Sequence, residues 1–228
     1  MFRPQAEVDM NSPILQLLVL AGIAVFLILR LKSVLGTREG FEKPPAVRDA
    51  GQSQRRTEFE VIEGGPDPDI VDNVEEDSPA ADALARMKRV EPSFGVTDFL
   101  GGARQAYEMI LMGFERSEMA EIQPFLSEDV YESFAAVVEA REEQGLTIEA
   151  EFVGVREMRL LDATFDDDSR LAEITVRFIG ELTQVVRDRA GEIVEGSPTQ
   201  IKRQKDVWTF AREMGSDNPN WQLVATGE

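Results

Sequence analysis

Residues 174–182 read ITVRFIGEL, with apolar side chains at positions 174, 176, 178 and 182 and mostly polar residues between them. Residues 147–152, TIEAEF, alternate in the same way. A period of two is typical of a β-strand that has one face against a core and the other in solvent. The chain from residue 147 onward is therefore predicted to form a sheet.

Turn sequences divide this region into strands. The predicted turns lie at 166–169 (DDDS), 188–191 (DRAG) and 215–219 (GSDNP). Two further strands are then expected, near 201–211 and 221–226. Gly154 interrupts the alternation of the first strand, which indicates a β-bulge. Four antiparallel strands follow from this pattern.

Before Gly145 the apolar residues recur every three or four positions, which is typical of helices. The predicted helices cover residues 80–90, 96–114 and 127–145. Ser78 and Pro79 form a start signal for the first helix. Gly101 and Gly102 lie inside the second helix, where either a close neighbour or chance explains them. Helices followed by strands predict an α+β fold, with the helices packed on one face of the sheet.

An apolar run lies ahead of this region, after a short segment at 1–13. Residues 14–31 read ILQLLVLAGIAVFLILRL, which as a helix spans roughly 27 Å, just enough for the hydrocarbon core of a membrane. The predicted anchor side chains are Ile14, Leu15, Leu17, Leu18, Val19, Leu20, Ile23, Val25, Phe26, Leu27, Ile28 and Leu29. A cleaved signal peptide would need a positive start, and a core helix would carry a polar stripe. We therefore predict one transmembrane helix.

Charges on the two sides of this run predict its orientation. Arg30, Lys32 and Arg38 follow the run, whereas residues 1–13 carry no net positive charge. The positive-inside rule then places the carboxyl-terminal side in the cytoplasm. Both Met1 and Met10 stay open as the translation start.

Residues 32–77 form the predicted acidic, flexible linker to a folded domain at 78–228. This stretch is rich in proline, glycine and acidic residues and has no amphipathic period, so it cannot bury enough apolar surface to offset its ordering entropy. One apolar island, Phe59, Val61 and Ile62, interrupts it. The island is either a partner-docking motif, a stray apolar patch or a strand added to the domain's own sheet.

Composition excludes several classes of function. The net charge of −19 repels phosphate backbones, so we expect no nucleic-acid partner and a preference for basic partners. The chain has no Cys and no His, which removes cysteine nucleophiles, histidine bases and the usual zinc ligands. The acidic turn at 166–168 lacks the spacing of a Ca²⁺ loop. We therefore expect no enzyme activity, no cofactor and no metal.

Short motifs in a particular order carry a family resemblance. The last two predicted strands contain DVWTF at 206–210 and NPNWQL at 218–223, followed by Ala225 and Thr226. The upstream motifs are PSF at 92–94, FLGGA at 99–103, Tyr107, Ile110, LS at 126–127, Tyr131 and Phe134. In this order they resemble the Tim44-like domain family over about residues 80–226.

The resemblance implies a cone-shaped fold of the nuclear-transport-factor-two type, in which helices pack on a curved four-stranded antiparallel sheet around an apolar pocket. It also implies an adaptor that works at a membrane and recruits a heat-shock-seventy chaperone or a translocase. The chaperone-recruiting region of the mitochondrial import-motor member has no counterpart in this sequence, and no transit peptide precedes the anchor. The chain therefore looks like a bacterial relative, located in the inner (cytoplasmic) membrane.

Two sets of residues are candidates for contact with other molecules. Tyr107, Phe178, Trp208 and Phe210 either line the implied pocket or fill the core. Arg86, Lys88 and Arg89 form a basic cluster on the first predicted helix. This cluster either touches anionic lipid or pairs with the domain's surplus carboxylates.

Three functions compete at this stage. The leading one is a membrane-tethered adaptor or scaffold that recruits a chaperone, a translocase or a membrane-complex component to the cytoplasmic face. The alternative is a lipid or small-ligand binding module that uses the pocket. A ribosome tether, which a ribosomal relative of the family suggests, conflicts with the negative charge. A pocket filled by side chains would favour the adaptor, and an open polar one would favour ligand binding.

The anchor can be tested by membrane extraction. We expect the full-length protein to stay with membranes after a carbonate or high-salt wash, because insertion of its apolar side chains is favourable by several kcal/mol. The carboxyl end should be protected from protease in intact cells. Release by salt alone, or cleavage of the domain from outside, would contradict the anchor.

Overall fold

The computed structural model describes residues 66–227. The helices are α2 (Pro68–Val71), α3 (Pro79–Val90), α4 (Val96–Glu115), α5 (Met119–Ile122), the 3₁₀ helix η1 (Gln123–Phe125) and α6 (Glu128–Gln144). The strands are β1 (Thr147–Phe165), β2 (Leu171–Arg187), β3 (Ile193–Glu213) and β4 (Gln222–Gly227).

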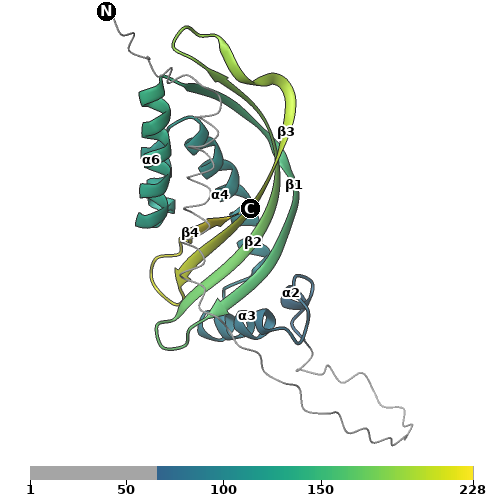
Figure 1. Ribbon diagram of the computed structural model, residues 1–228. Coiled ribbons are helices and arrows are strands. Elements are labelled where there is room, and N and C mark those ends of the chain that lie inside the picture. Colours follow the sequence, from purple (N-terminus) through teal and green to yellow (C-terminus); the bar gives the residue numbers. More distant parts are fainter. Residues whose placement is uncertain (1–65, 228) are drawn as a thin grey trace, which may run out of the picture. The chain divides into compact units, whose positions relative to one another are not determined.

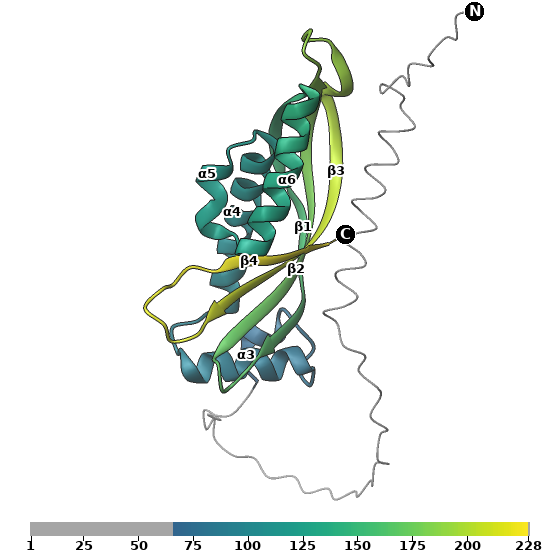
Figure 2. The same ribbon diagram turned by 60° about the vertical axis from the view of Figure 1, so that its left-hand side comes forward.

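The strands form one antiparallel sheet in the order β1-β2-β3-β4. The long strands curve, and α4 and α6 lie on the concave side of the sheet, while α3 lies near the turn between β1 and β2 (Figures 1 and 2). The predicted α+β fold with a four-stranded antiparallel sheet is confirmed. The narrower likeness to the nuclear-transport-factor-two type stays a prediction.

The ends of two helices lie where the local sequence predicts them. Ser78 begins α3, and its Oγ accepts a hydrogen bond from the Ala81 amide at 3.1 Å. Ser127 begins α6 in the same way and accepts from the Val130 amide. Gly145 ends α6 with a φ of 69°, a left-handed conformation that glycine adopts without steric penalty.

Strand β1 contains the predicted irregularity, because its pairing with β2 shifts register between Phe152 and Gly154. Strand β3 is longer than predicted: it begins at Ile193 instead of near Ile201. Most side chains of its first half are exposed on both faces. Without a buried face, this half lacks the apolar alternation from which a strand is predicted.

The segment α5–η1 was missed because helices of four and three residues are too short to show a period. The segment packs on α4 through Ile122, which is fully buried. A Cβ atom at Gly113 would collide with the Ile122 side chain. Gly113 is therefore required for this close approach of α5 to α4.

The first described residues belong to the fold, although residues 66–77 were assigned to the linker. Ile70, in α2, is only 4% exposed. The Asp69 carboxylate accepts hydrogen bonds from the Val96 amide at 2.7 Å, the Thr97 amide at 2.9 Å and the Thr97 hydroxyl at 2.6 Å. Lys88 Nζ lies 2.7 Å from the same carboxylate. The acidic segment is thus held by contacts between α2, α3 and α4.

Asp69 caps α4 from a distance. The residue before this helix is Gly95, which has no side chain to accept the free amides of the first turn. Burial by itself would raise the pKa of Asp69, but hydrogen bonds from Lys88, Thr97 and Val96 outweigh burial and hold that pKa well below its ordinary value. The carboxylate is therefore ionised in the folded protein at neutral pH.

Other predicted features lie outside the described residues. These are the transmembrane run at 14–31, the linker at 32–65 and the apolar island of Phe59, Val61 and Ile62. Within residues 66–227, every helix is too short or too polar to cross a membrane. The anchor and its orientation stay predictions.

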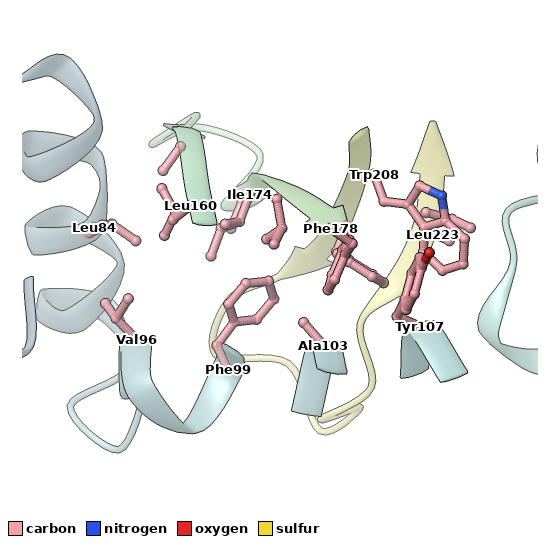
Figure 3. Packing of buried hydrophobic residues seen from close by; sticks show 14 of the residues in the cluster. Leu84, Val96, Phe99, Ala103, Tyr107, Leu160, Ile174, Phe178, Trp208 and Leu223 are labelled. Atoms are coloured by element: carbon pink, nitrogen blue, oxygen red, sulfur yellow. The ribbon is translucent and has the colours of Figure 1, made fainter. Parts of the chain in front are cut away.

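One apolar cluster joins the helices to the sheet. It runs from Leu84 of α3, through Phe99 and Tyr107 of α4, to Phe178 of β2 and Leu223 of β4 (Figure 3). All five side chains are buried or nearly so. At roughly 1.5–3 kcal/mol for each large apolar side chain buried, this cluster is the main source of stability of the domain.

Tyr107 is the centre of the cluster. Its ring stacks on Phe178 with centroids 4.4 Å apart and lies 4.8 Å from the ring of Trp208. Its hydroxyl donates to Asp206 Oδ2 at 2.6 Å. Burial and the neighbouring carboxylate raise the pKa of Tyr107, so the phenol stays protonated and serves as the donor. A Cβ at Gly180 would lie 2.5 Å from this hydroxyl, so Gly180 leaves room for it.

Glu115, at the end of α4, is a buried carboxyl group with 5% exposure. Gln184 Nε2 donates to its Oε2 at 2.8 Å, and Arg141 lies 3.9 Å away. Burial raises the pKa of Glu115 above its ordinary value, and Arg141 and Gln184 offset only part of the shift. This residue therefore destabilises the fold when it is ionised.

Replacement of Asp69 tests the remote cap. Asp69→Ala should lower the free energy of unfolding by about 1–2 kcal/mol, as loss of a helix cap does. Because the folded pKa of Asp69 lies below the ordinary value of 3.8, the stability that Asp69 contributes is present above that pH and is lost as the pH falls through the folded pKa. The measurement is thermal or urea unfolding of the full-length protein in mild detergent. Asp77→Ala, an exposed acid of the same segment, is the matched control and should change little.

Glu115→Gln tests the buried acid. Because the folded pKa is raised above 4.5, the stability gained from the protonated group is present below that pH and is lost as the pH rises through the folded pKa. The variant should therefore unfold a few degrees higher than the wild type at pH 7, and the two should converge near pH 4. Glu118→Gln, at an exposed position, is the control. An equal Tm for Glu115→Gln and wild type at pH 7 would contradict this account.

Candidate functional site: an aromatic groove between α4 and the β3–β4 corner

All four candidate pocket residues are buried in the core, and one of them also borders a groove at the surface. Tyr107, Phe178 and Trp208 are at most 3% exposed and fill the interior, where they pack on one another (Figure 3). Phe210, 2% exposed, lies against a surface groove. The interior of the domain at these positions is therefore packed, and the groove becomes the candidate site.

The groove has a volume of about 340 Å³. One wall is the first part of α4, from Gly95 to Ala106, and the other is formed by Phe210, Arg212 and residues 219–221. Glu91, Ser93, Phe94 and Phe125 complete the lining. Residues 91–106 thus meet residues 210–221, which lie more than 100 positions later in the sequence, in one depression.

Aromatic rings form much of its surface. Phe99 and Trp221 pack edge to face with centroids 4.7 Å apart. Phe94 lies 6.0 Å from Trp221, and Phe210 lies 6.0 Å from Phe99. Phe94 and Phe99 are nearly buried, whereas Trp221 is half-buried. Such rings offer an apolar partner contact area at a low cost in side-chain entropy.

A partly buried ion pair lies in the groove beside Trp221. Arg212 Nη2 lies 2.5 Å from Glu91 Oε2, and its guanidinium stands 5.3 Å from the centre of the Trp221 ring. Glu91 also accepts from the Gly215 amide at 2.9 Å, and Arg212 donates to the Pro219 carbonyl at 3.1 Å. Burial would raise the pKa of Glu91, but Arg212 and the Gly215 amide outweigh it and lower that pKa. The pair ties the end of α3 to the β3–β4 loop.

Two glycines on α4 differ in their relation to the groove. A Cβ atom at Gly101 or at Gly102 would meet no heavy atom within 4 Å, so no close neighbour explains either residue. Gly102 lines the groove, but Gly101 does not. The missing side chain at Gly102 therefore keeps this wall of the groove open.

The basic cluster on α3 is largely neutralised. Arg86 lies 3.2 Å from Asp82 and 2.7 Å from Asp167. Lys88 lies 2.7 Å from both Asp67 and Asp69. Arg89 is exposed. Arg86 and Lys88 are therefore paired with carboxylates, which is the second of the two interpretations given for this cluster.

The acidic turn at 166–169 is a structural turn. Asp166 accepts hydrogen bonds from the amide and hydroxyl of Ser169, both at 2.7 Å, and Asp167 pairs with Arg86. Across residues 66–227, no three carboxylates converge in an arrangement that could hold a metal ion. The groove presents mainly aromatic rings and a few charged side chains.

The sequence motifs that carry the family resemblance also supply most of the groove, although the sequence did not predict a groove. The groove is lined from the PSF, FLGGA, DVWTF and NPNWQL segments, which are the segments that carry the family resemblance. These motifs are separated by up to about half of the chain. Their proximity in the folded protein could therefore not be predicted from the sequence. Their shared location follows from the antiparallel sheet and from the direction of α4.

Comparison with known proteins identifies relatives of the folded domain. A family profile described as the Tim44-like domain matches residues 80–228. The human mitochondrial import inner membrane translocase subunit TIM44 is 24% identical over 147 residues, which cover 63% of this chain and 32% of the human protein. Subunit TIM44-1 of Arabidopsis thaliana is 23% identical over 150 residues, covering 63% of this chain and 31% of that protein. The chain thus spans about a third of the length of these relatives.

Among solved structures, the intermembrane space region of the chloroplast protein ARC6 aligns with 55% of this chain and 94% of its own length, at 10% identity. Its TM-score of 0.36 is too low to establish a shared fold. The family profile, in contrast, covers the folded domain almost completely, from the first turn of α3 to the end of the chain. The chain belongs to the Tim44-like domain family.

Proposed function

We propose that this protein is an adaptor that is held at a membrane and binds a segment of a partner protein in the aromatic groove. The observation that carries this function is the convergence on the groove of the four sequence motifs that carry the resemblance to the family, all of which lie within the residues that the family profile matches. The groove has the features of a protein contact site: large rings, a packed floor and a rim of mixed polarity. The domain acts by binding and not by catalysis.

The packed interior favours an adaptor over a lipid or small-ligand binding module. Tyr107, Phe178 and Trp208 occupy the space in which an internal ligand would lie. The groove itself is open at the surface, where an extended segment or a helix of another protein can reach it. Because the domain is strongly acidic, we propose a partner with a basic surface.

The membrane attachment in this proposal comes from the apolar run at 14–31. The relatives are named as subunits of an inner-membrane translocase, which agrees with a site of action at a membrane. We place the domain on the cytoplasmic face of a bacterial inner membrane, with residues 32–65 as the tether. A flexible tether of this length reaches roughly 30 Å, enough for the domain to meet a chaperone, a translocase or another membrane-complex component.

A crosslinking experiment tests the groove. A photoreactive amino acid in place of Asn220, on the groove wall, should give adducts of protein size in intact cells. Gly102→Leu should abolish these adducts because the new side chain fills the groove. Gly101→Leu is the matched control, because it removes a neighbouring glycine of the same helix at a position that also has free space. Both changes should raise the stability of α4 by up to about 1 kcal/mol.

Three results would count against the adaptor. One is an adduct of lipid size in place of a protein. Another is an equal loss of adducts in Gly101→Leu and Gly102→Leu, which would indicate a general effect on α4. The third is an unchanged adduct pattern in Gly102→Leu, which would mean that the partner lies elsewhere.

A further inference from the structure

Granting the proposed function of the groove, we infer that Asp98 makes it selective for a partner segment in which a bulky apolar side chain stands next to a lysine or arginine. The aromatic rings of the groove bind the apolar side chain, and the Asp98 carboxylate pairs with the lysine or arginine. The occupant is then a protein segment of defined chemistry, and Asp98 is a specificity-determining residue.

Asp98 stands at the groove in the first turn of α4 and is exposed to solvent. Its Oδ2 lies 3.0 Å from the position of a Cβ atom on Gly95, so the carboxylate is beside the glycine at which the helix starts. The carboxylate lies at the positive end of the helix dipole. A negative charge is therefore presented at the mouth of an aromatic site.

The other charges that line the groove are already satisfied. Glu91 is bound to Arg212 and to the Gly215 amide. The side chain of Arg212 is only 9% exposed and faces Trp221. Within residues 66–227, Asp98 is the one groove carboxylate without a hydrogen-bonding or ion-pair partner. The lining thus has one uncompensated negative charge.

The apolar part of the site sets the size of the occupant. Phe94, Phe99 and Trp221 enclose a volume suited to one or two side chains of a partner, not to a folded surface. The net charge of the chain also raises the local concentration of cationic segments. A leucine or phenylalanine beside a lysine satisfies both parts of the groove together.

Stabilisation of α4 is the competing role for Asp98. An acid in the first turn of a helix interacts favourably with the helix dipole whether or not a ligand binds. That role affects the Tm but does not discriminate between a cationic and an anionic ligand. Ligand selectivity therefore separates the two roles.

Trp221 provides the readout for the test. The chain has two tryptophans, of which Trp208 is 3% exposed and buried in the core, whereas Trp221 lines the groove. Short blocked peptides with leucine–lysine, leucine–glutamate or alanine–lysine at their centre are titrated into the full-length protein in detergent. The change in fluorescence gives a Kd for each peptide. Trp221→Phe should remove the response and so identify the reporter.

The leucine–lysine peptide should bind about threefold to fivefold more tightly than the leucine–glutamate peptide, as expected for a single partly exposed charge pair. The preference should weaken at high salt. It should disappear in Asp98→Asn and persist in Asp98→Glu. Asp217→Asn, an exposed acid of the β3–β4 loop outside the groove lining, should retain it. The alanine–lysine peptide should bind weakly because it leaves the rings uncovered.

Equal binding of the leucine–lysine and leucine–glutamate peptides would overturn this inference, and so would a preference that survives in Asp98→Asn. Absence of binding by every peptide would also overturn it. None of these results contradicts the adaptor function, provided that Gly102→Leu still abolishes the crosslinks from position 220. Crosslinks that persist in Gly102→Leu would instead contradict the adaptor function itself.

Discussion

The fit of Tyr107 between α4 and the sheet is the contact on which the arrangement of the domain depends. The ring stacks on Phe178, the hydroxyl reaches Asp206 on β3, and Gly180 provides the space. A stacked ring and a directed hydrogen bond together restrict both the rotation of α4 about its axis and its position along the sheet. Phe99 lies eight residues earlier on the same face of the helix, so the wall of the groove is placed by the same contact.

The charges of the domain are distributed unevenly between its interior and its surface. Four basic side chains, Arg86, Lys88, Arg141 and Arg212, are held by acidic partners within the fold. Their charges are therefore unavailable to partners, and the surplus carboxylates remain at the surface. In the proposed function, the net charge of the whole protein would attract a basic segment at long range, and the groove would recognise it at close range.

Elements with a regular period could be predicted from the sequence. The alternation around Phe178 indicated a strand, the helical spacing around Tyr107 indicated a long helix, and Ser127 with Gly145 marked both ends of α6. These signals are local, since each arises from residues within one element. They were enough for the α+β class and for the antiparallel sheet.

Features that depend on distant residues could not be predicted. Asp69 caps a helix that begins 27 residues later, and no local pattern marks it as a cap. The first half of β3 has no buried face, and α5 is shorter than the period that would reveal it. The groove is a contact between the start of α4 and the β3–β4 corner. Of its residues, Phe210 was a candidate for pocket lining, and most of the others appeared only within the family motifs. Tyr107 could equally have been pocket or core until its neighbours were known.

The attachment of Asp69 to α4 has a mechanical consequence. The Asp69 carboxylate is one direct connection between α2, where the described chain begins, and the amides of Val96 and Thr97. The next residue on that helix is Asp98, at the mouth of the groove. In the proposed arrangement, a load from the tether would reach the domain at the turn of α4 that borders the groove. Tension in the tether and occupancy of the groove would then act on neighbouring peptide groups.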